Sequence, residues 1–353
     1  MREPISNRVI LSNSLYEDLS KAIAECSHDK VFVLTDSTTH ALCWPLLSDF
    51  IGLRNAVQIT IPCGDTSKTL ESVTHMWEAL VSGGATRHSC LVCLGGGMVT
   101  DLGGFAASTF KRGIDYLNIP TTLLSMVDAS VGGKTGFNFH GLKNEVGVFA
   151  EPQFAIIHTK FLSTLDADNL RSGYAEMLKH GLISDKETWS ELLSFDISRP
   201  ELTRLQSMVG RSVAVKERIV EADPHEHGIR KALNLGHTIG HAIESWGMAS
   251  GAPMLHGVAV AHGLVGELYL SNVLSGFPLD KLRMTVSYIH EHYGRPTFTC
   301  NNYPSLLELM RHDKKNISGS INFTLLSDVG SIRINQTAST ELIQEALDFI
   351  REG

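Results

Sequence analysis

Four side chains with metal-binding chemistry stand out in the second half of the sequence. His237 and His241 are four residues apart, and on a helix this spacing places both imidazoles on one face. A third histidine, His256, follows, and a carboxylate, Glu176, lies upstream. Two imidazoles and one carboxylate form the ligand set of a catalytic zinc ion, with one position left for water or substrate. The spacing leaves open which histidines would be ligands, and hydrogen-bonded histidines in a packed core are an equally good interpretation of the pair alone.

The composition indicates a globular protein of two domains and argues against several classes of partner. The chain has 353 residues, of which 43% are hydrophobic, enough to bury a sizeable core. Its 38 acidic and 30 basic residues give a net charge of -8, which argues against binding to nucleic acid or to a membrane surface. The N-terminus lacks the apolar stretch of a signal peptide, and no run of about eighteen apolar residues is uninterrupted. We therefore expect a cytoplasmic protein.

The six cysteines are expected to be reduced. They are scattered through apolar segments and do not have the spacing of a disulfide framework. Cys90 and Cys93 form a C-x-x-C pair, which could serve redox chemistry or bind a metal. The pair lies in an apolar run that reads as a buried strand, where side chains three residues apart face opposite sides. The buried strand is therefore the interpretation that we favour.

Strands and helices alternate over the first half of the chain. Continuous apolar runs, typical of parallel strands buried on both faces, occupy residues 31–36, 57–61, 90–94 and 154–157. Apolar residues at helical spacing follow at 70–80 and at 98–110. This alternation predicts a doubly wound, Rossmann-like α/β domain over residues 1–165.

Two glycine-rich segments in this half suit a ligand that carries phosphate. Gly95-Gly96-Gly97 stands between a predicted strand and a predicted helix, where glycine allows close approach and the helix N-terminus offers N–H groups to a diphosphate. In the second segment, 128–136, glycines and hydroxyl residues surround Lys134. Neither segment has the spacing of a dinucleotide fingerprint or a P-loop. A tight turn without a ligand is the alternative for the first segment.

The second half predicts a mainly α-helical domain over residues 166–353. Helical periodicity covers 167–182, 186–195, 200–222, 230–247, 257–274 and 279–293, and two strand-like pieces at 321–326 and 331–334 precede a closing helix at 339–351. Four side chains could line one side of the predicted helix 230–247: Arg230, Asn234, His237 and His241. Glycines and apolar residues between them favour a cleft over a solvated face. Together with Lys179 and Lys216, this row indicates a small anionic substrate, a phosphate or a carboxylate.

Several motifs in one order resemble those of the 3-dehydroquinate synthases, which belong to the sugar phosphate cyclases. The resemblance covers nearly the whole chain and is tightest at 94–97, 119–124, 128–136, 173–176 and 233–242. It implies an NAD- and metal-dependent enzyme of the shikimate pathway, usually a homodimer, with its active site in the cleft between the two domains. The implied reaction converts 3-deoxy-D-arabino-heptulosonate 7-phosphate into 3-dehydroquinate and phosphate by transient oxidation with NAD, phosphate elimination, re-reduction and intramolecular aldol closure.

The resemblance also implies a role for individual residues. The metal ligands would be Glu176, His237 and His256, holding zinc or, alternatively, cobalt. Substrate would contact Arg112, Asp128, Lys134, Asn144, Lys179, Lys216, Arg230, Asn234 and His241, of which Lys134, Lys179, Arg230, Asn234 and His241 would be catalytic. Arg112 would reach the neighbouring subunit's site. NAD would contact Asp36, Cys63, Gly64, Asp65, Thr66, Ser67, Lys68, Gly97, Met98, Val99, Thr100, Asp101, Thr121, Thr122, Lys134, Lys143, Phe161, Leu162, Ser163 and Thr164.

Three departures from the family pattern and three alternatives accompany this reading. Thr100 stands where glycine is usual, the turn at 63–67 differs from the commoner acidic version, and the segment between His241 and His256 is a few residues longer. The alternatives are another cyclase such as a 2-deoxy-scyllo-inosose synthase, a metal-dependent polyol dehydrogenase, which would accumulate NADH, and a non-catalytic nucleotide-binding protein. The sequence leaves open whether Lys314 or Lys315 reaches the ligand.

Overall fold

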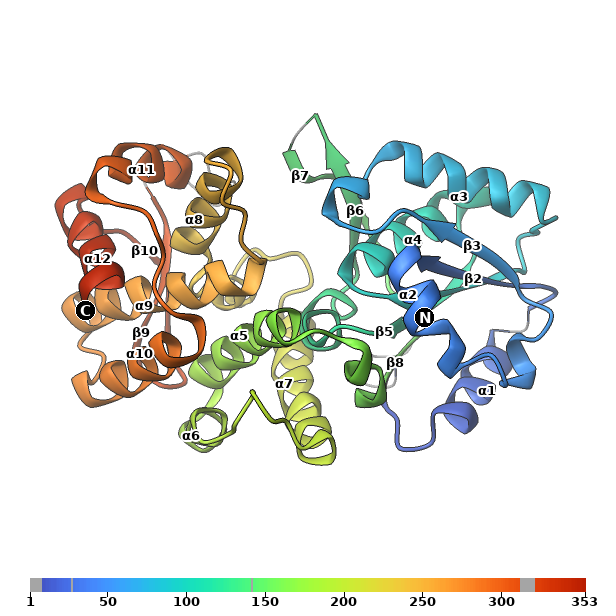
Figure 1. Ribbon diagram of the computed structural model, residues 1–353, viewed down its shortest axis with the longest axis horizontal. Coiled ribbons are helices and arrows are strands. Elements are labelled where there is room, and N and C mark those ends of the chain that lie inside the picture. Colours follow the sequence, from blue (N-terminus) through green and yellow to red (C-terminus); the bar gives the residue numbers. More distant parts are fainter. Residues whose placement is uncertain (1–7, 27, 141, 312–320) are drawn as a thin grey trace. The chain divides into compact units, whose positions relative to one another are not determined.

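The computed structural model describes residues 8–26, 28–140, 142–311 and 321–353 (Figure 1). The chain forms two compact units: Met1–Asp166 with Glu201–Val213, and Ala167–Pro200 with Ala214–Gly353. The sequence analysis assigns residues 201–213 to the second domain, whereas the structure groups them with the first unit. Gln206 explains the difference, because its side chain accepts hydrogen bonds from the N–H (3.0 Å) and the hydroxyl (2.7 Å) of Thr159 and donates one to the carbonyl oxygen of Ser12.

The first unit is built on a six-stranded sheet in which every neighbouring pair is parallel. The strands, in the spatial order β1-β8-β5-β4-β2-β3, are β1 (Val9–Leu11), β8 (Phe154–Ile157), β5 (Asp115–Pro120), β4 (Cys90–Gly95), β2 (Val31–Asp36) and β3 (Val57–Ile61). All residues of β2 and β4, including Cys90 and Cys93, are buried, as expected of strands covered on both faces. The order reverses between β2 and β4, so the predicted doubly wound fold is confirmed.

The helices of the first unit follow these strands. They are α1 (Leu15–Glu25), α2 (Ser37–Leu42), α3 (Leu70–Ser82), α4 (Gly97–Thr109) and the start of α7 (Leu202–Ala222). Short helical turns are η2 (Trp44–Leu46), η3 (Ile51–Leu53), η4 (Asp65–Ser67), η5 (Phe110–Arg112), η6 (Ser125–Ala129) and η7 (Thr159–Thr164). The helices α3 and α4 lie where the apolar spacing predicts them.

A β-hairpin that the sequence analysis does not predict follows η6. Its antiparallel strands are β6 (Lys134–Phe139) and β7 (Leu142–Phe149), which pair Gly136 with Gly147. A Cβ on Gly136 would lie 2.4 Å from the carbonyl oxygen of Val146, and one on Gly147 would lie 2.2 Å from that of Thr135. The glycines thus allow the two backbones to approach, but they also remove the alternating side chains by which a strand is recognised in a sequence.

The second unit is mainly helical, as predicted. Its helices are α5 (Ala167–Ser184), α6 (Lys186–Leu193), the rest of α7, α8 (His237–Ala249), α9 (His256–Ser275), α10 (Leu279–Tyr293), α11 (Tyr303–Arg311) and α12 (Thr340–Glu352). Two short turns, η8 (Ile229–Asn234) and η9 (Cys300–Asn302), and an antiparallel pair of strands, β9 (Phe323–Asp328) and β10 (Ser331–Gln336), complete it. The sequence analysis does not predict α11. Helix α9 is central, because it contacts α5, α8, α10, α12 and β9.

The predicted helix over 230–247 is wrong in its first turns. Arg230 and Asn234 lie in η8, and α8 begins only at His237. Between them Gly236 has a φ of 78°, in the left-handed region, and a Cβ there would lie 2.8 Å from Leu264. Only glycine is compatible with both the backbone and the contact. Arg230 and Asn234 therefore do not share a helix face with the histidines of α8.

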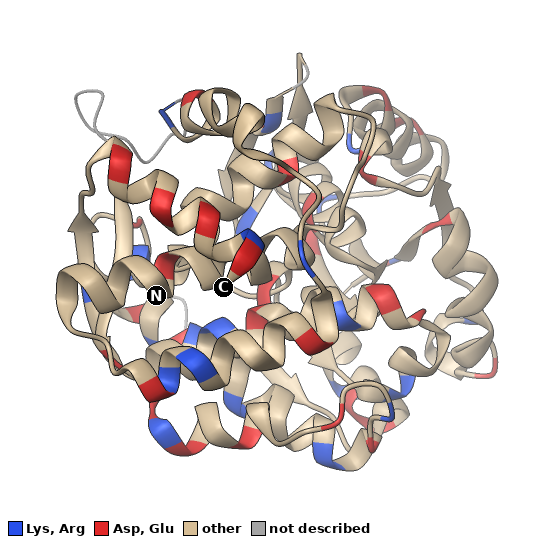
Figure 2. Ribbon diagram, turned by 60° about the vertical axis from the view of Figure 1, so that its left-hand side comes forward, with Lys and Arg blue, Asp and Glu red and all other residues tan. Residues whose placement is uncertain are grey.

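Helix α9 is long and apolar enough to cross a membrane, judged by length and composition alone. However, 72% of that window is buried inside the protein, and the helix carries three buried polar side chains, His262, Glu267 and Ser271. A helix that is apolar on all sides is also what the centre of a helical core requires. Figure 2 shows that acidic and basic residues are spread over many helices of the protein.

One glycine of α4 sets how closely this helix packs on the sheet. A Cβ at Gly103 would lie 2.3 Å from Sγ of Cys93 and 2.9 Å from Leu34. We expect Gly103→Ala to lower the free energy of unfolding by about 1–3 kcal/mol, because both neighbours are buried and must shift. Urea denaturation of the two proteins measures this. At an open helical position alanine would instead stabilise by about 1 kcal/mol, so a gain in stability would contradict the packing described.

Candidate functional site

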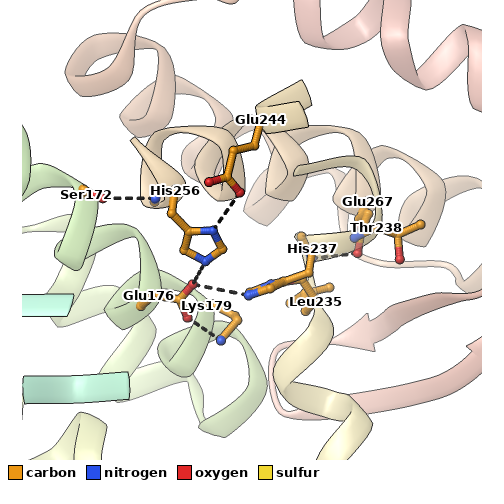
Figure 3. A network of polar contacts seen from close by, with 11 residues as sticks. Ser172, Glu176, Lys179, Leu235, His237, Thr238, Glu244, His256 and Glu267 are labelled. Carbon is orange, nitrogen blue, oxygen red and sulfur yellow. Dashed lines mark hydrogen bonds and ion pairs between the residues drawn. The ribbon is translucent and has the colours of Figure 1, made fainter. Parts of the chain in front are cut away.

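Three helices of the second unit bring a carboxylate and two imidazoles to one point (Figure 3). Glu176 of α5 is fully buried, and its Oε1 lies 3.5 Å from Nε2 of His237 and 3.6 Å from Nε2 of His256. The histidines are the first residues of α8 and α9. When a tetrahedral zinc ion has bonds of about 2.1 Å, neighbouring ligand atoms lie about 3.4 Å apart. The observed separations therefore fit a single divalent ion between the three groups.

Glycines allow these helices to approach closely enough. A Cβ on Gly257, which follows His256, would lie 1.8 Å from the carbonyl oxygen of Ser172 in α5. The N–H of Gly257 donates to the Ser172 hydroxyl at 3.0 Å, which ties the start of α9 to α5. A Cβ on Gly263 would lie 1.9 Å from the carbonyl oxygen of Gly236, where α8 begins. Helix α9 thus packs against the backbone of α5 and against the backbone at the start of α8, the two other helices that contribute to the site.

Each of the two histidines is oriented by an acceptor at its second ring nitrogen. Nδ1 of His256 lies 3.1 Å from Oε2 of Glu244, and Nδ1 of His237 lies 3.0 Å from the carbonyl oxygen of Leu235 (Figure 3). Both acceptors require a proton on Nδ1, which in the neutral ring leaves a lone pair on Nε2. Histidines that bind metals are typically held in this way by a carboxylate or a carbonyl oxygen.

The charges around Glu176 favour a cation. Burial alone would raise the pKa of Glu176, but the Lys179 ammonium and the His256 imidazole outweigh burial and lower it below the ordinary value. Lys179 forms an ion pair with the other carboxylate oxygen, Oε2. Oε1 is buried and makes no hydrogen bond among the described residues, since its distances to the imidazoles are too long. A buried anionic oxygen without a hydrogen bond is a position for a metal ion.

His241 lies beside this cluster, one turn after His237. Its ring centre is 5.2 Å from that of His237 and 5.7 Å from that of His256, as expected from the four-residue spacing on α8. One ring nitrogen from each of the three histidines lies within 4.8 Å of the others, so an all-histidine ligand set is also geometrically possible. The set with Glu176 is better supported, because it accounts for the buried carboxylate oxygen and for both oriented imidazoles.

The predicted substrate residues of the second unit lie on several different elements. Lys179 belongs to α5, Lys216 to α7, and both are buried. On η8, the Arg230 guanidinium donates to the carbonyl oxygen of Pro224 (2.5 Å), and the Asn234 amide donates to Glu226 (3.0 Å). The carboxylate of Asp223 shapes this loop by accepting the N–H groups of His227, Gly228 and Arg230.

Most of the predicted nucleotide residues of the first unit lie at one edge of its six-stranded sheet. Asp36 ends β2, the turn 63–68 follows β3, residues 97–101 open α4 after β4, and Thr121 and Thr122 follow β5. These are the carboxyl ends of the strands beside the reversal of strand order, where open α/β sheets bind ligands. No side chain caps α4, whose N-cap is Gly96, so its first N–H groups can receive a phosphate.

Side-chain contacts connect this edge to the β6–β7 hairpin. The Lys68 ammonium lies 2.5 Å from the Asp101 carboxylate and is hydrogen-bonded to Asn144, whose φ of 50° is in the left-handed region. Lys143 forms an ion pair with Asp65 at 3.4 Å. The structure therefore brings together four residues assigned to the nucleotide and one assigned to the substrate.

The other predicted residues of the first unit are partly buried in its core. Oδ1 of Asp36 caps α2 by accepting two N–H groups, both at 2.8 Å. The Thr100 hydroxyl donates to the Gly97 carbonyl oxygen at 3.1 Å, so this departure from the family pattern is accommodated within α4. The side chains of Val99, Phe161 and Leu162 are buried, which leaves their backbone and the flanking Ser163 and Thr164 for a nucleotide.

The remaining predicted residues lie on η5, η6 and the start of β6. Arg112 ends η5, and both it and Lys111 have positive φ angles of 69° and 50°. Asp128 lies in the π-helical turn η6, and Lys134 is exposed at the first position of β6. Lys314 and Lys315 fall outside the described residues.

Sequence reasoning gave no role to three carboxylates that the structure shows to be important. Glu244, which orients His256, follows His241 by three residues, so its place on the same helix was a usable signal. Glu267 is buried against the start of α8, and Asp223 organises the loop before η8. The contacts of Glu267 join segments that the sequence does not relate, whereas those of Asp223 stay within its own loop.

Comparisons with known proteins agree with this geometry. Residues 58–172 match the family described as 3-dehydroquinate synthase N-terminal, and residues 173–316 match 3-dehydroquinate synthase C-terminal. A 3-dehydroquinate synthase of Parabacteroides distasonis is 54% identical over 346 residues, which cover 98% of each chain.

Solved structures show the same fold. A 2-epi-5-epi-valiolone synthase from Streptomyces hygroscopicus subsp. jinggangensis, with NAD+ and Zn2+ bound, has a TM-score of 0.85 at 26% identity, covering 99% of this chain and 98% of the other. A 2-deoxy-scyllo-inosose synthase complexed with carbaglucose-6-phosphate, NAD+ and Co2+ has a TM-score of 0.84 at 24% identity, covering 98% and 96%. The family matches together span most of the chain, and the sequence identity over its full length supports them. The chain belongs to the 3-dehydroquinate synthase family.

Proposed function

We propose that this chain converts 3-deoxy-D-arabino-heptulosonate 7-phosphate into 3-dehydroquinate and phosphate. The observation that carries the proposal is the cluster of Glu176, His237 and His256, whose separations fit one divalent ion. The related cyclases with the same fold are only 24% and 26% identical to this chain, against 54% for the 3-dehydroquinate synthase relative. The dehydroquinate reaction is therefore preferred over that of another cyclase.

The protein residues fit both an NAD and a divalent ion. Glu176, His237 and His256 would hold the ion, and the sheet edge around α4 would hold the nucleotide. When bound, the ion acidifies a hydroxyl group of the substrate, and NAD accepts and later returns a hydride. Because the hydride is returned, the net reaction releases phosphate without accumulating NADH.

The basic residues would then bind and orient an anionic substrate. Lys179 keeps the Glu176 carboxylate ionised, as a metal ligand must be, through the ion pair at Oε2. The buried Arg230 guanidinium suits a carboxylate, which it can bind through two parallel hydrogen bonds. Beside the cluster, His241 can stabilise the charge on the leaving phosphate. We assign the same task to Lys134 and Lys216, and substrate orientation to Asn234, Asn144, Asp128 and Arg112.

We further propose zinc as the ion, the cytoplasm as the location and a homodimer as the assembly. Two nitrogen ligands and one oxygen ligand suit zinc. The hairpin β6–β7 supports a dimer, because Phe139, Leu142 and Phe149 are 40%, 56% and 57% exposed. The two adjacent left-handed residues ending at Arg112 are strained, which is common where a side chain must reach a ligand. Arg112 would reach the active site of the partner subunit.

The reaction itself tests the proposed function. We expect the protein, given NAD, zinc and 3-deoxy-D-arabino-heptulosonate 7-phosphate, to release one phosphate per substrate while the absorbance of NADH stays flat. Inorganic phosphate and the absorbance are followed in the same sample. A polyol dehydrogenase would accumulate NADH, and a non-catalytic nucleotide-binding protein would release no phosphate; either result would reject the proposal.

Replacing the buried carboxylate tests the metal site. We expect Glu176→Gln to weaken zinc binding at least 100-fold and to abolish turnover, because the amide is neutral and a poor ligand. Competition with a chromogenic chelator measures the affinity. The matched control is Glu187→Gln, at an exposed carboxylate on α6 of the same unit, which should bind zinc as the parent does. Unchanged zinc affinity in Glu176→Gln would exclude this ligand.

Metal binding should release protons at neutral pH. Burial lowers the pKa of His256, but the carboxylates of Glu176 and Glu244 raise it to about 10 in the metal-free cluster. The imidazole is therefore protonated at pH 7 and must lose its proton to bind zinc, so the zinc affinity should rise as the pH is raised from 6 to 8. Calorimetry in buffers of different ionisation enthalpy counts the protons, and a count of zero at pH 7 would contradict the assignment of His256.

A further inference from the structure

We propose that Glu267 is a positioning residue that holds His237 in place for the metal ion. This inference rests on the proposed function, because it presumes that His237 is a ligand. Glu267 lies on α9 and is fully buried. Its carboxylate accepts the backbone N–H groups of Gly236 at 2.6 Å, Thr238 at 2.9 Å and Ile239 at 3.2 Å. Figure 3 shows Glu267 beside Thr238 and His237.

The start of α8 lacks the capping side chain that a helix usually carries. Its N-cap is Gly236, which makes no side-chain hydrogen bond, so the first N–H groups of the helix need an acceptor from elsewhere. Glu267 supplies that acceptor from a different helix. A negative charge at a helix N-terminus is favoured by the helix dipole, and three N–H bonds offset the cost of burying the carboxylate.

These bonds fix the backbone on both sides of the metal ligand. His237 stands between Gly236 and Thr238, which are both bonded to Glu267, and its own Nδ1 contacts the carbonyl oxygen of Leu235. His237 is therefore held both at its imidazole ring and along its backbone. A metal site tolerates an error of only about 0.5 Å in ligand position, so an anchor at this point controls whether His237 can bind.

The same helix carries the other imidazole. Helix α9 begins with His256 and reaches Glu267 three turns later, and between them Gly263 packs against the carbonyl oxygen of Gly236. One rigid helix thus sets the distance between the two histidine ligands. Its first residue would bind the ion, and Glu267, near its middle, would position the second ligand.

The test compares zinc and cobalt affinity in the full-length protein and in Glu267→Gln. The amide keeps the shape and one acceptor oxygen but turns an NH2 group towards the helix N–H groups. We expect a 10–100-fold weaker affinity for both ions in chelator competition, and an altered visible absorption spectrum of the cobalt form. Glu267→Ala should have a larger effect, and the Gln variant serves if the Ala variant does not fold.

The matched control is Asp185→Asn, which removes another helix-capping carboxylate of the same unit. Asp185 caps α6 by accepting the Thr188 N–H at 2.9 Å, away from the histidines. This variant should be less stable in urea but bind zinc and cobalt as the parent does. If Glu267→Gln behaved in the same way, its role would be merely structural and the inference would be overturned. If the parent protein itself bound neither ion, the proposed function would fail, and the inference with it.

Discussion

Burying a carboxylate inside a helical core costs free energy unless charges and hydrogen bonds compensate it, and the second unit buries Glu176 completely. Lys179 compensates one oxygen, while the other faces two imidazoles at distances too long for hydrogen bonds and suited to a shared ion. Helices α5, α8 and α9 each bring one of these three side chains to the same point. A cation there satisfies the carboxylate and both nitrogen lone pairs at once.

Close helix packing makes the arrangement rigid. Gly257 and Gly263 bring α9 against the backbone of α5 and of the α8 start, and Glu244 and Glu267 add polar contacts that orient the two histidines. The first unit has different features: the uncapped start of α4 and the turn at 63–68, both at the carboxyl edge of its parallel sheet. The proposed reaction needs both sets of features, since it combines a hydride acceptor with a Lewis acid.

Much of the fold could be predicted from periodicity. The strands at 31–36 and 90–94 and the helix at 279–293 are found where the apolar patterns place them, because burial alone decides those elements. The break at Gly236 could not be predicted, since an isolated glycine is tolerated within a helix and only its contact with Leu264 fixes the left-handed backbone. The short helix α11 does carry a usable signal, because its buried residues Tyr303, Leu306, Leu307 and Met310 have helical spacing. The hairpin β6–β7 lacks one, because its facing glycines interrupt the alternation of side chains.

The candidate site was predictable to a similar extent. The spacing of His237 and His241 predicts that their rings are neighbours, but it cannot say which ring meets Glu176, because that depends on how α5 and α9 pack. The family resemblance supplied that choice. Glu267 could not be found from the sequence, since its partners are backbone groups about 30 residues away and it stands in an apolar helix.

The most direct test is a crystal structure of the zinc-loaded protein, with diffraction data collected on both sides of the zinc absorption edge. The account predicts one anomalous peak in the second unit, about 2.0–2.2 Å from Oε1 of Glu176 and from Nε2 of His237 and His256. A zinc ion bound by His241 in place of Glu176, or one bound elsewhere in the chain, would contradict it.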